Sequence, residues 1–478
     1  MKSYQNRLLR STEPTIMTDS IRQVFHAYDI RGLSPEELDE PFAFRLGQAV
    51  VKQFQPKTVL VGRDMRVTSP ALEAALIKGL TESGANVTRI GLCSTPMFNV
   101  LVGLGNGAYD MGVMVTASHN PGKYNGFKLD RGDASPIGKG SGMDELAEAV
   151  ASGIEFPAAQ VQGTVTEDPT ALQRYVDHIL KLAALPADMP KTKIAIDAGN
   201  GMAGAVLPEL LKRLPWLEVL PLYFEPDGSF PNHEANPLKT ETLADLIALV
   251  KKESCALGFA FDGDADRVGF VDEKGTAIRG DIATALFSQE ILKQFPNGLV
   301  LYNVCSSWTV PEVVAEAGGR SKMSKVGHAF IKRQMREEGA VFAGEPSMHY
   351  YFHDLYFVES GDLALLLLLR RLAREKKTLS ELCAPLMRYV HSGEINFTVA
   401  DKDAALSRVK EAYAAKATSS SDLDGIRYEF RESGHPENDW WFSFRMSNTE
   451  PLVRLSVESR DAETTRKHVE EISKLITA

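Results

Sequence analysis

Strand-like and helix-like segments alternate along most of this chain, and this alternation limits its fold more than any other feature. The run Thr58–Gly62 is apolar and β-branched, and segment 69–84 after it has its leucines on one helical face. Segment 191–214 repeats the order of strand, glycine-rich turn and helix, and apolar runs start again at Ala256 and Gly298. Because strands that alternate with helices of this length form βαβ units, we expect α/β domains with largely parallel sheets.

The C-terminal part of the chain follows another pattern. Segments 393–400, 426–430, 440–446 and 452–459 look like antiparallel strands, and 462–476 looks like a terminal helix. Short strands in succession, without a helix between each pair, indicate a separate α+β domain. We therefore expect the chain to end in a domain of a different kind.

Length and loop positions suggest several domains. A chain of 478 residues is long enough for three or four. Loop-like stretches at 131–141 and 153–169 bracket a boundary after the first domain, and another loop lies at 417–424. No short-period repeat is visible, but three successive α/β blocks could be distant copies of one another.

The bulk composition is that of a soluble globular protein, with 44% hydrophobic and 24% charged residues. The formal net charge of -10 argues against nucleic acid or an anionic membrane as a partner. The four cysteines are far apart and form neither a disulfide framework nor a zinc motif. Residues 1–20 lack the apolar stretch of a secretory signal, and the longest apolar run, Leu363–Leu369, is too short to cross a bilayer. We therefore expect a cytoplasmic protein.

The first chemical motif is "TASHNP" at 116–121, directly after the apolar run Met111–Val115. A serine hydrolase of the α/β type would show G-x-S-x-G, which this sequence lacks. A serine hydroxyl just past a strand end can instead accept a phosphoryl group, with His119 and Lys128 handling protons or charge. An ordinary turn, with Ser118 capping and Asn-Pro shaping it, explains the hexapeptide about as well.

The second motif is "FDGDADR", with Asp262, Asp264 and Asp266 at alternate positions of a tight loop. Carboxylates alone favour a hard cation such as Mg²⁺ or Ca²⁺. An EF-hand is excluded, because Arg267 stands where that loop needs glycine and the flanks are strand-like. A plain acidic turn is disfavoured, since like charges between two apolar strands need a compensating cation. We expect an open Mg²⁺ site, with Arg267 near enough to hold a phosphate oxygen.

Two further loops complete the set. "AGEPSMH" at 343–349 places a glutamate beside a serine at a strand end, which can bind vicinal sugar hydroxyls, although a plain turn is the simpler explanation. "FRMSNTEP" at 444–451 gathers a guanidinium, two hydroxyls, an amide and backbone N–H groups, a set that suits a phosphate dianion. A polar hairpin loop is the alternative. Together the four motifs favour phosphoryl transfer on a sugar phosphate, in a cleft between domains.

With these residues in view, the sequence resembles the α-D-phosphohexomutase family, in its bacterial phosphomannomutase/phosphoglucomutase branch. The resemblance runs from about Val24 to the end and includes, in the family's order, "FHAYDIRG", "TASHNP" with "YNGFK", "DGDADR", "GEPS" and "RMSNTEP". It implies three related α/β domains with mixed sheets, a C-terminal TATA-binding-protein-like α+β domain, and an active site in the central cleft. The implied segments are a flexible tail at 1–20, a phosphoserine domain at 21–163, a metal-binding domain at 164–276, a sugar-recognition domain at 277–388 and a phosphate-binding domain at 389–478.

The resemblance also implies roles for individual residues. Ser118 would carry the phosphoryl group, and Mg²⁺ would be bound by Ser118 with Asp262, Asp264 and Asp266. The other residues expected at the reacting centre are Arg31, His119, Lys128, Arg267 and His328, with Lys128 and His328 as candidates for proton transfer. Those expected to bind substrate are Tyr28, Glu345, Ser347, His349, Arg445, Ser447, Asn448 and Thr449, in which Glu345 and Ser347 read O3 and O4 of the sugar.

The implied reaction moves a phosphoryl group reversibly between O1 and O6 of a hexose phosphate, through phosphoserine and a hexose 1,6-bisphosphate. Glucose 1,6-bisphosphate would serve as activator, mannose and glucose phosphates as substrates, and a monomer is expected. This sequence departs from the branch in one loop, where Pro346 replaces the methionine of G-E-M-S. Phosphoglucosamine mutase is the alternative within the family. A Mg²⁺-dependent sugar phosphatase and a non-catalytic sugar-phosphate sensor are alternatives outside it.

Overall fold

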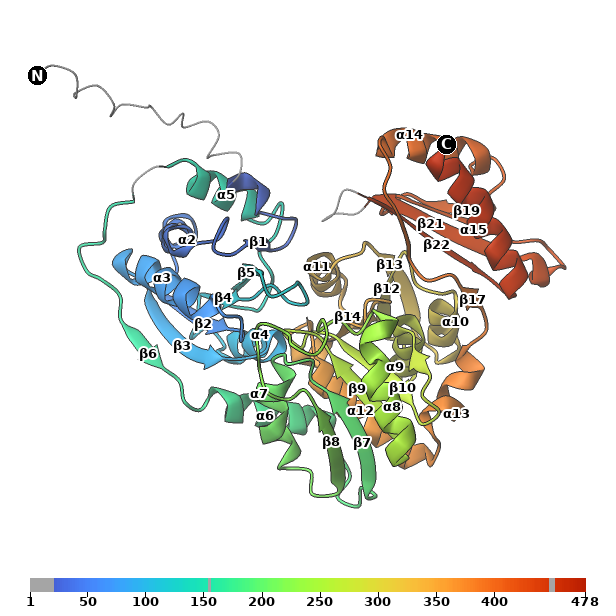
Figure 1. The fold of residues 1–478 in the computed structure, drawn as a ribbon, viewed down its shortest axis with the longest axis horizontal. Coiled ribbons are helices and arrows are strands. Elements are labelled where there is room, and N and C mark those ends of the chain that lie inside the picture. The colour runs from blue at the N-terminus through green and yellow to red at the C-terminus, as the bar shows by residue number, and fades with distance from the viewer. Residues whose placement is uncertain (1–20, 154–155, 447–451) are drawn as a thin grey trace, which may run out of the picture.

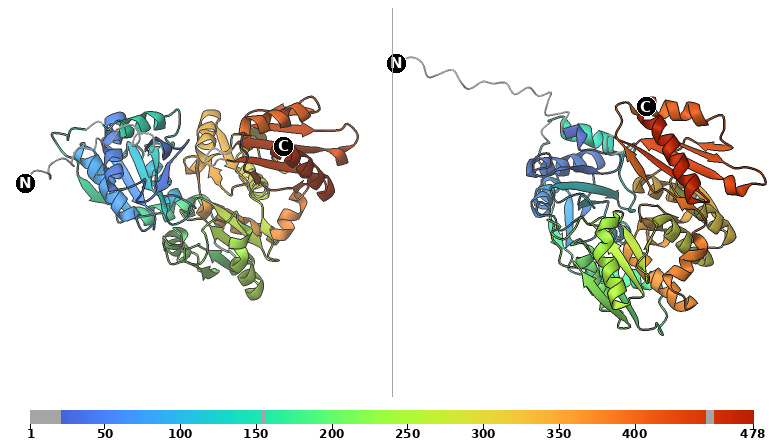
Figure 2. Two further views of the ribbon diagram at one scale, coloured as in Figure 1. Left: turned by 45° about the horizontal axis from the view of Figure 1, so that its top comes forward. Right: turned by 45° about the vertical axis from the view of Figure 1, so that its right-hand side comes forward.

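The computed structural model describes residues 21–153, 156–446 and 452–478. Its strands form four sheets, each in its own part of the chain (Figure 1). The first three parts follow one another around the centre of the molecule, and the C-terminal part stands beside the third, which both views of Figure 2 also show. The elements that follow are given sheet by sheet.

The first sheet has the strand order β1-β5-β4-β2-β3-β6. Strand β2 runs parallel to β3 and β4, whereas β5 runs antiparallel to both β4 and β1. The strands are β1 (Ile30–Leu33), β2 (Thr58–Arg63), β3 (Asn86–Leu92), β4 (Met111–Val115), β5 (Tyr124–Arg131) and β6 (Val165–Glu167), and the helices are α2 (Glu40–Phe54), α3 (Ser69–Glu82), α4 (Thr95–Leu104) and α5 (Met143–Ala151). Strand β6 pairs with β3, just beyond the boundary expected at residue 163.

The second sheet has the order β11-β10-β9-β7-β8. Strand β7 runs parallel to β8 and β9, and β10 is antiparallel to β9. Its strands are β7 (Thr192–Asp197), β8 (Leu217–Leu222), β9 (Leu257–Phe261), β10 (Val268–Asp272) and β11 (Ala277–Ile278), with helices α6 (Ala171–Ala183), α7 (Ala203–Leu211), η1 (Thr240–Leu243) and α8 (Ala244–Glu253).

The third sheet has the order β13-β12-β14-β15-β16. Strand β12 runs parallel to β13 and β14, and β15 is antiparallel to β14. Its strands are β12 (Leu299–Asn303), β13 (Arg320–Ser324), β14 (Ala340–Gly344), β15 (Tyr350–Phe352) and β16 (Val358–Glu359), with helices α9 (Gly280–Gln294), α10 (Thr309–Glu316), α11 (His328–Glu338), η2 (His353–Leu355), α12 (Gly361–Glu375), α13 (Leu379–Cys383) and η3 (Ala384–Leu386).

These three sheets repeat one plan. In each, the first strand of a four-strand set pairs in parallel with the second and third, and the fourth returns antiparallel to the third. The sets are β2–β5, β7–β10 and β12–β15. The expectation of three related α/β domains with mixed sheets is thereby confirmed. It follows that the loops β4–β5, β9–β10 and β14–β15 occupy equivalent positions, and these loops carry the serine, aspartate and glutamate motifs.

The C-terminal sheet is antiparallel throughout its described pairs. Its strands are β17 (Val390–His391), β18 (Ile395–Phe397), β19 (Ser419–Ser421), β20 (Ile426–Phe430), β21 (Trp440–Met446) and β22 (Val453–Ser459), with helices α14 (Lys402–Tyr413), η4 (Pro436–Asn438) and α15 (Ala462–Thr477). This is the α+β pattern expected for the end of the chain. The domain boundaries themselves stay a prediction.

The apolar run Leu363–Leu369 lies within α12 and is buried, as expected for a core helix. Helix α12 packs against α6 and α9 and lies beside β10, so it ties the second and third parts together. Among the described residues, no helix is both long and apolar enough to cross a membrane.

Candidate active site

The three equivalent loops meet one another. Ser118, in the β4–β5 loop, donates a hydrogen bond from its Oγ to Asp262 Oδ2 in the β9–β10 loop at 3.1 Å. His349, at the end of the β14–β15 loop, has its Nε2 3.3 Å from Asp266 Oδ1. The shared sheet plan therefore brings residues that are far apart in sequence to one buried place.

Ser118 is buried and has a left-handed backbone, with φ of 51°. Its backbone N–H donates to Thr116 Oγ1 at 3.0 Å, and its Oγ also lies 3.2 Å from His119 Nδ1. Burial, then the nearby cations Arg267 and Arg31, hold the pKa of His119 well below its usual value. A neutral imidazole thus stands beside the serine hydroxyl.

The aspartate triad fits a hard cation. One carboxylate oxygen from each of Asp262, Asp264 and Asp266 lies within 4.8 Å of the others, and all three residues are buried. Burial, and then the two like charges, raise the pKa of Asp262 well above its usual value. Asp264 Oδ1 has no hydrogen-bond partner among the described residues. A buried all-oxygen set with an unpaired oxygen is chemically suited to Mg²⁺.

Lys128 lies against the same triad. Its Nζ donates to Asp264 Oδ2 and to Asp266 Oδ2, both at 2.7 Å. Burial opposes the charge, but the two carboxylates outweigh it and raise the pKa of Lys128. In this arrangement Lys128 is a fixed cation, which suits charge balance better than the proton transfer expected from the sequence.

The glutamate loop is joined to the triad through His349. Burial disfavours the imidazolium, but the Asp266 and Glu345 carboxylates outweigh burial and raise the pKa of His349 to about 9. The other ring nitrogen, Nδ1, lies 2.9 Å from Ser347 Oγ and 3.2 Å from Glu345 Oε2. Arg267 Nε lies 3.2 Å from His349 Nε2 and 3.8 Å from Asp262 Oδ2.

Glu345 is buried and already has protein partners. Its carboxylate accepts from Tyr351 Oη at 2.7 Å and from Asn303 Nδ2 at 3.1 Å. Burial opposes ionisation, but His349, Tyr351 and Asn303 together hold its pKa at about 2. Gly327 N also donates to Oε1 at 3.3 Å, and His349 Nδ1 lies 3.2 Å from Oε2, so about four acceptor positions of this carboxylate all have protein partners.

His328 and Tyr28 contact each other across the first and third domains, edge to face, with ring centroids 4.6 Å apart. Burial, and then Lys332 and Lys128, hold the pKa of His328 well below its usual value. Its Nδ1 has no hydrogen-bond partner among the described residues.

Arg31 belongs to the serine side of the site. It donates from Nη1 to Asn120 Oδ1 at 2.8 Å and pairs with Asp29.

The predicted phosphate loop is described only in part. Arg445 is buried on β21, and its Nη2 donates to Glu394 at 2.8 Å, so its described ion pair lies within the C-terminal domain. Ser447, Asn448 and Thr449 lie outside the described residues. No described contact joins Arg445 to the triad.

Sequence reasoning missed several residues of the site. Thr95, the first residue of α4, donates from Oγ1 to Asp264 Oδ2 at 2.6 Å. Asn303 is the last residue of β12, and Tyr351 lies on β15. Asn303 could have been found, because a polar residue at the carboxyl end of a parallel strand often faces a ligand site. Thr95 and Tyr351 carry no such local signal.

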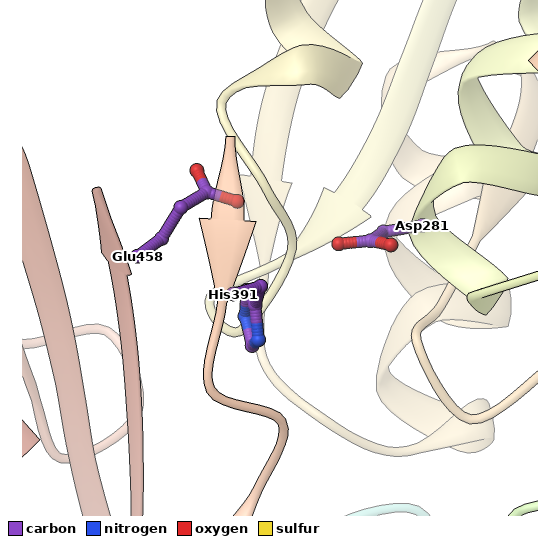
Figure 3. A group of neighbouring side chains, drawn as sticks. All are labelled: Asp281, His391 and Glu458. Carbon is purple, nitrogen blue, oxygen red and sulfur yellow. The ribbon is translucent and has the colours of Figure 1, made fainter. Parts of the chain in front are cut away.

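A second group of ligand-type side chains lies elsewhere, at the contact between the third and fourth domains (Figure 3). Asp281 on α9, His391 on β17 and Glu458 on β22 also have ligand atoms within 4.8 Å of one another. Here Arg279 supplies a cation, with Nε 3.0 Å from Asp281 Oδ1 and Nη2 3.9 Å from Glu458 Oε2. We therefore interpret this group as an interdomain ionic cluster, distinct from the triad.

The chain matches four family models that follow one another. They are phosphoglucomutase/phosphomannomutase alpha/beta/alpha domain I at residues 22–155, domain II at 173–275, domain III at 279–389, and the C-terminal domain at 394–475. Together these models extend from the N-terminal strand region to the last helix. The fold and the site thus define a phosphohexomutase, an isomerase.

Individual relatives agree. A phosphomannomutase from Methanocaldococcus jannaschii is 40% identical over 459 residues, which cover 95% of this chain and 97% of that protein. A protein described as phosphohexose mutases, from Xanthomonas campestris, is 40% identical over 454 residues, covering 95% and 98%. The solved structure of a phosphoglucomutase/phosphomannomutase family protein from Burkholderia thailandensis has a TM-score of 0.85 at 31% identity, covering 95% and 97%. The chain belongs to the phosphoglucomutase/phosphomannomutase family.

Proposed function

We propose that this phosphohexomutase transfers a phosphoryl group reversibly between O1 and O6 of a hexose phosphate, with Ser118 as the carrier and a hexose 1,6-bisphosphate as the intermediate. The observation that carries the proposal is the 3.1 Å hydrogen bond from Ser118 Oγ to Asp262 within a buried aspartate triad. A serine hydroxyl among carboxylates is a poor place for a hydrolase nucleophile. It is a suitable place for a phosphoserine whose charge a divalent cation neutralises.

Asp262, Asp264 and Asp266, together with an oxygen on Ser118, would hold Mg²⁺. A bound Mg²⁺ supplies charge neutralisation at the phosphoryl oxygens. In the transfer, the bond between phosphorus and Ser118 Oγ breaks and a bond from phosphorus to the sugar hydroxyl oxygen forms. After the bisphosphate reorients in the site, the same steps in reverse return its other phosphate to Ser118. Catalysis then depends mainly on positioning and electrostatics.

The sugar hydroxyl must lose a proton as it attacks, and we assign that proton to His328. Its lowered pKa keeps the imidazole neutral at neutral pH, and its Nδ1 is unpaired among the described residues. Lys128, which is bound to two aspartates, balances charge as the phosphoryl group moves. Arg267 and Arg31 are further cations near His119, whose pKa they lower.

The preferred hexose is a finer part of the proposal. Several similar proteins are described as phosphomannomutases, and this supports mannose phosphate as a substrate. A site that binds the sugar through O3 and O4, with Glu345 and Ser347, makes no contact with C2, the position where glucose and mannose differ. We therefore propose both as substrates, with glucose 1,6-bisphosphate as activator and a monomer as the working unit. Comparing turnover of mannose, glucose and glucosamine phosphates tests this order, and a clear preference for glucosamine phosphate contradicts it.

The serine assignment is tested by Ser118→Ala. We expect a loss of mutase turnover of about 1,000-fold or more, because no carrier remains. Ser407→Ala is the matched control, since that hydroxyl bonds only within α14, to Asp403 O. Both variants should keep the same unfolding midpoint as the unmodified protein within about 2 °C. Unchanged turnover in Ser118→Ala refutes the proposal, and release of inorganic phosphate without isomerisation supports a phosphatase instead.

A further inference from the structure

Arg66 lies directly behind the serine loop and is completely buried. Among the described residues, its guanidinium donates to Asp64 and to backbone carbonyl oxygens of that loop and of Tyr124, the first residue of β5. The carbonyl acceptors are Ser118 O at 2.8 Å and Asn120 O at 2.5 Å from Nη2, and Pro121 O at 2.8 Å and Tyr124 O at 2.9 Å from Nη1. One side chain therefore binds three carbonyl oxygens of the loop and that of Tyr124.

Arg66 is itself fixed in place. Its Nε donates to Asp64 Oδ2 at 3.1 Å, and its backbone N–H donates to Asp64 Oδ1 at 3.0 Å. Ser69 Oγ donates to the same oxygen, and Asn125, which begins the return along β5, donates to Ser69 Oγ at 3.0 Å. A buried ion pair costs desolvation and is weak evidence for stability, so stability alone does not account for this pair.

That geometry matters because Ser118 has a left-handed backbone, which non-glycine residues rarely adopt. Without an external hold, a serine relaxes toward the common regions of φ and ψ, and its Oγ direction changes with its backbone. Arg66 binds the Ser118 carbonyl oxygen at 2.8 Å. It thereby keeps the Oγ directed at Asp262, and it turns electron-rich carbonyls away from the side where phosphate would be carried.

The second domain closes around this arrangement. A Cβ built on Gly228 would lie 2.5 Å from Arg66 Cα, and one built on Gly263 would lie 2.4 Å from Ser118 O. The Phe230 ring lies 5.3 Å from the guanidinium carbon of Arg66. The 227–230 loop therefore packs closely against the backbone of Arg66 and against Gly122 of the serine loop, without room for a larger residue at Gly228.

We propose that Arg66 is a positioning residue for phosphoryl transfer: it fixes the Ser118 hydroxyl in line with the aspartate triad, and the 227–230 loop holds it there. This inference rests on the proposed function, in which Ser118 carries the phosphoryl group. Arg66 acts through Ser118. All its described donors are committed to carbonyls and to Asp64, so it is not a phosphate ligand.

The test compares Arg66→Lys and Arg66→Gln with Arg63→Gln. Arg63 is a matched control, since it also contacts Asp64, at its backbone O from Nη1 at 3.2 Å, but does not touch the serine loop. Each protein is loaded with glucose 1,6-bisphosphate, its phosphoserine is quantified by intact mass, and transfer to a hexose phosphate is followed in a single turnover. Rates are then expressed per loaded phosphoserine, so that misfolded protein, which carries no phosphate, does not lower the measured rate.

We expect both Arg66 variants to transfer about 100-fold more slowly per loaded phosphoserine, with the KM of the hexose phosphate changed less than about threefold. Lysine keeps the charge but cannot serve four carbonyls, so it should not rescue the rate. Arg63→Gln should behave like the unmodified protein. If Arg66→Lys transfers phosphate as fast per loaded phosphoserine as the unmodified protein does, the proposal is overturned.

A variant in the other domain keeps the test decisive if the Arg66 variants do not fold. Gly228→Ala leaves the first domain's sequence unchanged but pushes the 227–230 loop off Arg66, and we expect it to slow transfer about tenfold per phosphoserine. An unchanged rate in Gly228→Ala overturns the proposal. A different result would refute the proposed function, and it is measured before any variant is made. In that result, the unmodified protein never carries phosphate on Ser118.

Discussion

The two groups of ligand-type side chains in the described structure have the same size and similar burial, but they differ in what surrounds them. The triad of Asp262, Asp264 and Asp266 joins equivalent loops of the three repeated sheets and contacts Ser118. The cluster of Asp281, His391 and Glu458 lies between the third domain and the C-terminal domain. The triad lies at the expected reaction site, and the interdomain cluster joins two domains.

Hydrogen bonding separates them further. In the interdomain cluster, Gly393 N donates to His391 Nδ1 at 2.9 Å, and His391 Nε2 lies 3.1 Å from Cys305 O. Both ring nitrogens are thus occupied, and Arg279 balances the acids. Asp264 Oδ1 in the triad and Glu458 Oε2 in the interdomain cluster both lack a hydrogen-bond partner among the described residues. The comparison teaches that the donor set distinguishes the two groups: the triad offers three carboxylates beside a serine hydroxyl, whereas the interdomain cluster has two carboxylates and a histidine whose ring nitrogens are both occupied.

The largest expected effect comes from Asp264→Asn. Removing one charge from the triad should lower turnover about 100- to 1,000-fold, since charge neutralisation at the phosphoryl group depends on the cation held there. Steady-state turnover on a hexose phosphate, across a Mg²⁺ titration, measures it. Glu458→Gln is the control in the other cluster, and it should change turnover less than twofold. Equal losses of turnover in Asp264→Asn and Glu458→Gln would show that the two groups do not differ in function.

Arg279→Gln should produce the next largest effect, on stability. It leaves the buried carboxylates of Asp281 and Glu458 without their cation, which costs about 2 kcal/mol of unfolding free energy, less than for a fully buried pair because the Arg279 side chain is 36% exposed. Urea unfolding measures the change. Arg320→Gln is the control, because that side chain is exposed and its Nε bonds only to Asn297 O. A loss below about 1 kcal/mol in Arg279→Gln shows that the cluster is not held by this arginine.

The interdomain cluster should also give the protein a distinct acid sensitivity. Burial, and then Arg279 and Arg427, lower the pKa of His391 from 6.5 to about 4. Because the folded pKa is depressed, the stabilisation is present above pH 6.5 and is lost as pH falls through 4. We expect His391→Gln to reduce the stability lost between pH 7 and 4 by about 2 kcal/mol. Parallel stability profiles for the two proteins would contradict the assignment.

The smallest effect is stabilisation by Mg²⁺ itself. At a free Mg²⁺ concentration ten times its dissociation constant, binding to the folded state should add about 1.4 kcal/mol of unfolding free energy. Glu458→Gln should keep this increment, and Asp264→Asn should lose it. If Glu458→Gln loses the increment while Asp264→Asn retains it, the metal belongs to the interdomain cluster.

The sequence predicted local features well. Three aspartates at alternate positions of one tight loop, and a serine just past a strand end, carry their chemistry within a few residues, and the triad and Ser118 do lie together. The resemblance supplied the domain plan, and the shared strand order explains why separate motifs meet. Lys128 shows the limit: its neighbours Asp264 and Asp266 come from another domain, so its two ion pairs could not be predicted from the sequence around it.

Long-range partners could not be predicted for the same reason. The contacts of Arg66 with the serine loop, and of Glu345 with Asn303, depend on how the strands are paired and not on any local pattern. Arg279 and Glu458 lie in different domains, so nothing in either segment indicates that one balances the other. Local chemistry can be recognised in a sequence, whereas the hydrogen-bond partners of each polar atom depend on the assembled fold.

The most direct test of this account is the intact mass of the purified protein before and after glucose 1,6-bisphosphate, with any phosphate located by peptide fragmentation. The account predicts one phosphate, on Ser118, that is lost or exchanged when hexose phosphate and Mg²⁺ are added. A Ser118 that remains unmodified after exposure to the bisphosphate would contradict the account.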